Sequence, residues 1–241
     1  DFAFSGCSSL LTADFPSSLS RIGNYAFSKC IALKKIKIPF IEDIGIGIFD
    51  GCPLCEVSIS IKNIPKEFFK SFNSIQQIFI ESPASEISSY SFSLCQSIVR
   101  ISIPSTVDKI GSFAFYRCTS LTQISIPFSL KVIEPFTFDG CESLTQIIIP
   151  PSVEKIGNNA FSNCPSLKKI EIPPVNEIGE NAFNGCVSIE LSDKMKIIPN
   201  DLFKNCNSLT QIKIPSSIEY IGSYAFYNCK SLSKVNIPSS V

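Results

Sequence analysis

The sequence repeats with a period close to 23 residues, and this period limits the folds open to the chain more than any other feature. Phe-x-x-Cys occurs ten times between Phe4 and Cys229, and Phe69-x-x-Phe72 marks an eleventh unit with Phe in the Cys position. Successive Cys positions are separated by 23, 22, 20, 23, 23, 23, 23, 22, 20 and 23 residues. Such regularity is the signature of a solenoid. We therefore expect residues 1–241 to form a single solenoid of about eleven units, partial ends included.

Each unit contains two segments with different local patterns. In the unit at 103–126, residues 121–126 read Leu-x-x-Ile-x-Ile and are followed by Pro, which predicts a very short strand that Pro ends. Residues 110–118 read Ile-Gly-x-x-Ala-Phe-x-x-Cys, with apolar residues near i, i+4, i+5 and i+8. This spacing predicts one or two turns of α- or 3₁₀-helix that begin at Gly111.

One strand and one helical turn cannot bury their own apolar side, so the units are expected to stack. Parallel strands lie about 4.8 Å apart, and stacking at this spacing joins the Leu, Ile, Val, Ala, Phe and Cys positions into continuous interior ladders. The predicted fold class is an α/β repeat solenoid. We expect a right-handed superhelix with a parallel sheet on one face and short helical or 3₁₀ turns on the other.

Together, Leu-x-x-Ile-x-Ile-Pro and Val-x-x-Ile-Gly-x-x-Ala-Phe-x-x-Cys resemble the 23-residue leucine-rich repeat of the BspA-like, or Treponema-type, family. The resemblance covers essentially all 241 residues. It implies a surface or secreted protein of a bacterium or of a mucosal protozoan such as Trichomonas or Entamoeba, and the Ser, Ile, Lys and Asn content favours the protozoan members. It also implies adhesion, because several members are described as binding host matrix proteins, epithelial cells or other microbes.

Two units depart from the pattern. Each has 20 residues, and Ile64-Pro65 and Ile198-Pro199 stand where most other units have Ile-Gly. We expect local irregularities of the solenoid at these two places.

Ten of the eleven cysteines occupy one position of the repeat, and three interpretations compete. They could be buried thiols, disulfides or zinc ligands. Burial is favoured because Phe72 replaces Cys in one unit, because stacked Cβ vectors run parallel, and because a linear ladder without His does not converge on a metal. Cys55 is out of register; it could pair with Cys52 or fill a shortened turn, and a free thiol is the favoured interpretation. The predicted structural thiols are Cys30, Cys52, Cys95, Cys118, Cys141, Cys164, Cys186, Cys206 and Cys229.

Composition argues against several classes of function. Lys plus Arg and Asp plus Glu each number 21, so there is no basic excess for binding nucleic acid. The chain has no His, the commonest general base, and its Gly pairs lack the context of a phosphate-binding loop. We predict no enzyme activity and no catalytic, cofactor-binding or metal-binding residues. No apolar run approaches the roughly 20 residues of a membrane-spanning helix, so no membrane insertion is expected.

The outward positions of the predicted strands form the most informative surface. Alternation directs the residue before the first Ile, and the residue between the two Ile positions, away from the interior. This predicted partner-binding face is basic and rich in amides, with Phe79 and Ile148 as outward apolar residues. Its residues are Lys35, Lys37, Gln77, Phe79, Arg100, Gln123, Gln146, Ile148, Lys169, Glu171, Gln211, Lys213 and Lys234.

These observations favour a non-enzymatic interaction or adhesion module whose partner is a protein. By resemblance, the partner is a host-cell or extracellular-matrix protein, and the module is at the cell surface or secreted. An intracellular scaffold, and therefore a cytoplasmic location, stays open, as does a structural spacer that presents another domain. The chain begins and ends inside repeat units. We therefore expect a fragment of a larger protein, with frayed ends or end-to-end self-association through uncapped repeats.

Overall fold

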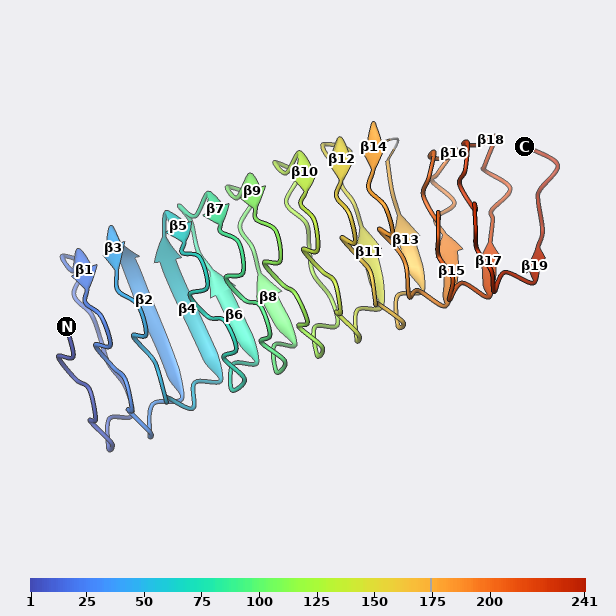
Figure 1. Ribbon diagram of the computed structural model, residues 1–241. Coiled ribbons are helices and arrows are strands. Elements are labelled where there is room, and N and C mark those ends of the chain that lie inside the picture. The colour runs from blue at the N-terminus through green and yellow to red at the C-terminus, as the bar shows by residue number, and fades with distance from the viewer. Residues whose placement is uncertain (174) are drawn as a thin grey trace.

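The structure is a computed structural model that describes residues 1–173 and 175–241. The chain winds into an elongated stack of coils, with the N-terminus and the C-terminus at opposite ends (Figure 1). All the strand pairings described are parallel and join one coil to the next. The expected leucine-rich-repeat solenoid with a parallel sheet is confirmed.

One strand from almost every coil contributes to the first ladder. Its outward side is called the sheet face below. The ladder is interrupted between β8 and β11, so it consists of two sheets. The strands are β2 (Lys35–Ile41), β4 (Glu56–Ile61), β6 (Gln77–Ile80), β8 (Arg100–Ser102), β11 (Gln146–Ile148), β13 (Lys169–Glu171), β15 (Ser188–Leu191), β17 (Gln211–Lys213) and β19 (Lys234–Val235).

Proline limits most strands of the first ladder, as the sequence predicts. β8 ends at Ser102, two residues before Pro104, and β13 ends at Glu171, two residues before Pro173. β2 instead continues through Pro39, and its register with β4 shifts between Ile38 and Phe40. A bulge is one of the few places where a strand tolerates the missing N–H of proline.

A second ladder of two-residue strands follows the first in each coil. Its strands are β1 (Arg21–Ile22), β3 (Asp43–Ile44), β5 (Asn63–Ile64), β7 (Glu86–Ile87), β9 (Lys109–Ile110), β10 (Val132–Ile133), β12 (Lys155–Ile156), β14 (Glu177–Ile178), β16 (Ile197–Ile198) and β18 (Tyr220–Ile221). Pairing stops between β3 and β5, between β9 and β10, and between β14 and β16. The first and third breaks lie at the two 20-residue units, where the sequence predicts irregularity.

The third side of each coil, called the turn face, contains the Phe-x-x-Cys segments and corrects one prediction. Across residues 1–173 and 175–241 there is no α-helix and no 3₁₀-helix, so the expected helical turns are wrong and the class is all-β. The segment at Phe115 explains why. Phe113 and Arg117 have φ values of 60° and 53°, in the left-handed region that interrupts a right-handed helix.

Backbone hydrogen bonds give the physical reason for this difference. Alternate amides of the turn face donate to the next coil: Phe113 to Pro135, Phe115 to Thr137 and Arg117 to Asp139, at 3.2, 2.9 and 2.7 Å. The amides between them close turns within the coil: Ala114 to Gly111, Tyr116 to Phe113 and Cys118 to Phe115. A helix would use these amides internally, whereas this arrangement joins neighbouring coils.

The core is a set of parallel side-chain columns along the stack. The rings of Phe92, Phe115, Phe138 and Phe161 are separated by 5.2 to 5.4 Å between centroids, with planes within 3 to 8°. Stacked aromatic pairs add about 0.5–1.5 kcal/mol beyond burial of their area. The apolar period of the sequence is therefore converted directly into interior contacts.

The Ile-Gly position has a packing role rather than the helix-initiating role predicted for it. A Cβ atom on Gly111 would lie 2.5 Å from the backbone nitrogen of Ser89 in the preceding coil. Glycine here allows two backbones to approach closely, which a larger residue would prevent.

Candidate functional site

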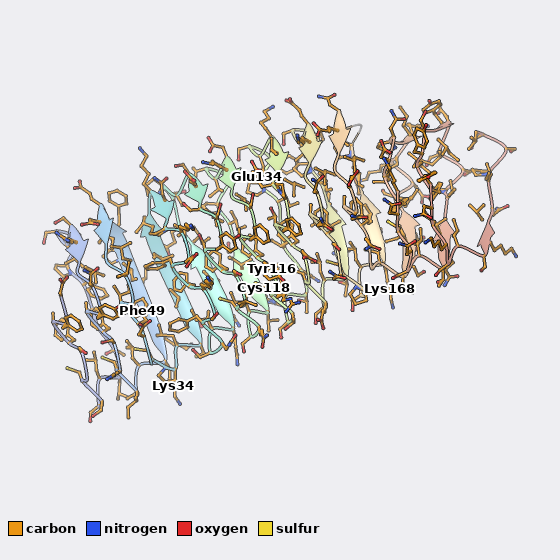
Figure 2. All side chains as sticks on the ribbon, viewed as in Figure 1. Lys34, Phe49, Tyr116, Cys118, Glu134 and Lys168 are labelled. Carbon is orange, nitrogen blue, oxygen red and sulfur yellow. The ribbon has the colours of Figure 1, made fainter. Side chains whose placement is uncertain are left out.

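The first ladder presents the predicted partner-binding residues on one side of the stack. Twelve of the thirteen are exposed and Glu171 is half-buried, while the residues between them in the strands point into the core. Figure 2 shows Cys118 within the body of the stack, whereas Lys34 and Lys168, just before two first-ladder strands, lie at its edge. The strands therefore place the predicted residues on a common, solvent-facing surface.

The register of the strands changes which of these residues are neighbours. Lys169 pairs with Glu190, and Glu190 pairs with Lys213, so Lys213 continues the column of Lys169 rather than that of Glu171. Gln211 instead pairs with Ser188 and Lys234. The shift is two residues, and since side chains alternate with period two, every residue stays on its expected face.

Carboxylates neutralise much of the basic charge that the sequence pattern indicates. Lys35 Nζ lies 3.1 Å from Glu56, and Lys37 Nζ lies 3.4 Å from Glu81. Ser58 donates a 2.6 Å hydrogen bond to Glu81, and this bond, with the nearby Lys37, lowers the pKa of the Glu81 carboxyl.

The same neutralisation occurs near the C-terminal end of the sheet face. Lys213 pairs with Glu190 and lowers the pKa of that carboxyl, while the pKa of the Lys213 ammonium is raised. Sequence analysis did not include Glu56 and Glu190 in the partner-binding face. They occupy outward positions of the strands that contain Glu-Val-Ser-Ile and Ser-Ile-Glu-Leu. Strict alternation, applied to the two shortened units, would have identified both as residues of the sheet face.

Three cations of the sheet face lack such a partner. In the part of the chain that the structure describes, no carboxylate lies within 4.0 Å of the Arg100, Lys169 or Lys234 side-chain nitrogens. Gln77 and Gln123 flank Arg100, Gln146 pairs with Lys169, and Lys234 pairs with Gln211. These side chains can donate hydrogen bonds and offer localised, rather than uniform, positive charge.

Apolar side chains interrupt this polar surface at its middle. Phe79 and Ile148 are exposed, as predicted from alternation. Sequence reasoning missed Phe128, whose side chain is 75% exposed just beyond the first ladder. Phe128 follows the Pro of an Ile-Pro turn, outside the strand pattern used to choose candidates. Its position relative to Ile148 becomes evident only from the surface hollows that both line.

The thiol ladder lies on the opposite, turn-face side of the core. Eight of the nine predicted thiols are buried and Cys229 is half-buried, and all are free. Each Sγ typically donates to the backbone oxygen of Phe in the preceding coil, as in Cys118 to Phe92 at 3.2 Å and Cys141 to Phe115 at 3.3 Å. The same Phe115 oxygen also accepts a hydrogen bond from the backbone amide of Cys118. The Cys141 thiol therefore binds to the second lone pair of that oxygen.

Burial keeps these thiols chemically quiet. Desolvation raises the pKa of Cys52 to about 11 and the pKa values of Cys95 and Cys164 to about 12. The thiolate is the reactive form, so protonated and inaccessible thiols resist oxidation. Cys55 is free and half-buried, and its Sγ donates to the Lys34 oxygen at 3.3 Å.

Neither metal ligation nor membrane insertion receives positive evidence from the geometry. Within the described ranges, no group of three or more His, Cys, Asp or Glu side chains could hold a metal ion. Among the same residues, the structure contains no helix that is long and apolar enough to cross a membrane.

Comparisons with known families place this geometry in context. The family model described as BspA type leucine rich repeat region (6 copies) matches residues 1–100, 62–190 and 176–241. A search of curated proteins gave no significant match.

Solved structures resemble the fold. A leucine-rich repeat protein from Bacteroides ovatus is 31% identical with a TM-score of 0.68, and the alignment covers 99% of this chain and 63% of that protein. The T. pallidum leucine-rich repeat protein is 30% identical with a TM-score of 0.53, over 74% of this chain and 83% of its own. This chain thus spans less than two thirds of the length of the B. ovatus protein.

A more distant structure supports the fold alone. A leucine rich cell surface protein from Faecalibacterium prausnitzii is 21% identical with a TM-score of 0.50, over 92% of this chain and 72% of its own. These three relatives are bacterial, so the protozoan source expected from composition has no support among them.

Proposed function

Because the chain belongs to the BspA-type leucine-rich repeat family, we propose that it is a non-enzymatic module that binds proteins through its sheet face. We place its action at the cell surface or outside the cell, where the partner is a host-cell or extracellular-matrix protein. Family resemblance is what suggests this location.

The observation that carries the proposal is the contrast between fixed backbone and varied side chains on the sheet face. Within each of the two sheets the strands hold outward residues in fixed register, while the side chains at equivalent positions change, as from Lys35 to Glu56, Gln77 and Arg100. A rigid array of different side chains can match an extended partner surface. Affinity then comes from many weak contacts over a large area rather than from one deep pocket.

A direct test measures binding of the labelled chain to a panel of purified extracellular-matrix proteins and to fixed epithelial cells. The test variant reverses two unpaired charges of the sheet face, Arg100→Glu and Lys169→Glu. The control variant reverses two exposed charges of the turn face, Lys29→Glu and Lys230→Glu. Both variants should unfold at the same temperature as the parent chain, since all four side chains are exposed.

The proposal expects saturable binding of the parent chain that the sheet-face variant loses and the turn-face variant keeps. Equal binding by all three chains would show that another face makes the contact. Absence of saturable binding to every panel member and to the cells would contradict the adhesive role and favour a scaffold or spacer.

A further inference from the structure

Strand pairing in the first ladder is interrupted where residues 123–126 lie beside β11. On one side of this segment, Gln123 forms only an isolated pair with Arg100. On the other side, the Thr145 amide donates to Thr122 at 3.2 Å, and within the described residues no later backbone hydrogen bond joins 123–126 to β11. We call this place, residues 123–126 together with β11, the seam.

Packing at the seam differs from packing in neighbouring coils. Ile101 and Ile147 are buried, but Ile124 at the equivalent position is only half-buried. A hollow of about 270 Å³ lies here. Its lining includes residues 123–126, Phe128, Gln146, Ile148 and Pro150. The seam therefore leaves backbone groups of residues 123–126 without a partner in β11, beside an apolar surface.

A second, larger hollow adjoins the first and shares its two exposed apolar side chains. Phe128 is 75% exposed and Ile148 is 57% exposed, and both line this hollow of about 530 Å³. Its other apolar walls include Pro150, Pro151, Ile172, Pro173 and Met195. Large apolar side chains grouped around concave surface, with a polar rim, are typical of recognition sites.

The charged side chains on the walls of the two hollows are paired, and the unpaired Arg100 and Lys169 lie outside those walls. Lys194 lies 3.4 Å from Glu171, and Lys196 lies 3.1 Å from Glu219. The remaining polar side chains on the walls of the smaller hollow are Gln123, Ser125 and Gln146, which are uncharged. A complementary occupant therefore carries no net charge, a large apolar group, and hydrogen-bonding groups for the open backbone.

We propose that the seam binds an extended, uncharged peptide segment of a partner protein, with one large apolar side chain between Phe128 and Ile148. The backbone of the segment lies across the hollow and hydrogen-bonds to groups of residues 123–126 that have no partner in β11. This inference rests on the proposed protein-binding function and names the part of the sheet face that contributes most to affinity.

The experiment selects binders from a random peptide library displayed on phage, with the intact chain as target. The recovered peptides are synthesised, and their affinities are measured by calorimetry for the parent chain, for Phe128→Ser and for Ile148→Ser. The matched control is Phe40→Ser, because Phe40 is exposed on β2, far along the stack from the seam. Thermal unfolding of each variant checks that the fold is retained.

We expect uncharged peptides with a conserved aromatic or aliphatic residue. Each seam variant should weaken binding at least about tenfold, whereas Phe40→Ser should leave affinity within about twofold. N-methylation of backbone amides next to the apolar residue should also abolish binding. Recovery of charged peptides, equal binding by the seam variants, or no binders at all would overturn the inference.

Two further experimental outcomes distinguish the seam inference from self-association and from the proposed function itself. If Phe128→Ser abolishes self-association in sedimentation experiments, the occupant is a second copy of the chain, and the proposal is wrong. If matrix or cell binding is lost in the charge-reversal variant but not in the seam variants, the proposed function stands and the seam inference fails.

Discussion

The turn-face columns and the sheet face of this solenoid are built from the same coils but follow opposite rules. On the turn face, Phe and Cys recur in almost every coil, and their rings and thiols make the same contact repeatedly. On the sheet face, the backbone recurs but equivalent side chains differ, as in the column of Lys35, Glu56 and Gln77.

The difference shows where sequence is constrained by stacking and where it is free. An interior position must match the coils above and below, so one residue type propagates along the column. An outward position contacts solvent and tolerates variation. Stability and recognition are thereby assigned to different sides of the same coil, and the following predictions test that division from the largest effect to the smallest.

Alkaline pH should cause the largest loss of unfolding free energy, because it favours ionisation of the buried thiols. Burial raises the pKa values of Cys95 and Cys164 to about 12, above the value of about 8.5 for an unfolded thiol. Their stabilising contribution is complete below about pH 8.5 and is lost as the pH rises toward 12, at up to about 1.4 kcal/mol per pH unit for each thiol. Urea unfolding under reducing conditions should therefore show a steep fall in unfolding free energy above pH 9.

The control for this effect is a chain with Cys95→Val and Cys164→Val, in which the fall should be shallower. An unfolding free energy that stays constant to pH 10.5 in the parent chain would contradict the assignment of these thiols to a desolvated core.

Removal of one aromatic ring should lower the unfolding free energy strongly in the interior and hardly at all on the exposed side of the coil. Phe138→Ala removes a buried ring that stacks on Phe115 and Phe161, and it should cost about 3–5 kcal/mol in urea unfolding. Phe128→Ala removes an exposed ring ten residues earlier in the chain and should change stability by less than about 0.5 kcal/mol. Similar losses in both variants would contradict the division.

The thiol hydrogen bond should contribute a smaller amount. Cys141→Ala removes the Sγ that donates to Phe115 and leaves a small cavity, so we expect a loss of about 1–2 kcal/mol in unfolding free energy. Cys55→Ala is the comparison, because this half-buried thiol lies outside the ladder. If both substitutions cost the same, the ladder position has no special role.

Ion pairs of the sheet face should contribute least. Lys35→Ala breaks the exposed pair with Glu56, and solvent screening limits the expected loss to less than about 0.5 kcal/mol. The difference between parent and variant should disappear in high salt. A loss comparable to that of Phe138→Ala would mean that the sheet face also determines stability.

Much of this architecture follows from the period of the sequence. The spacing of Phe115, Cys118 and their equivalents predicts the stacked units, the parallel sheet and the buried Cys position, because an interior column requires repetition. The same period led to a wrong prediction of helical turns on the turn face. Apolar spacing is compatible with a helical turn, and the left-handed φ values of Phe113 and Arg117 carry no strong sequence signal.

The sheet face was less predictable for related reasons. Strand alternation placed residues such as Lys37 and Gln146 on the outward side, but the neighbours of each residue depend on register. Register shifts where units are shortened, and it brings Lys213 beside Glu190. The hollows at Phe128 depend on an interruption of pairing between coils, which no single unit encodes.

The central claim is that recognition belongs to the sheet face and stability to the turn-face columns. Hydrogen–deuterium exchange of the intact chain with and without a bound protein partner tests it most directly. The account predicts slowed exchange in first-ladder strands, strongest at residues 123–126 and β11, with little change at turn-face amides such as Phe115. Slowed exchange confined to the turn face, with the first ladder unaffected, would contradict it.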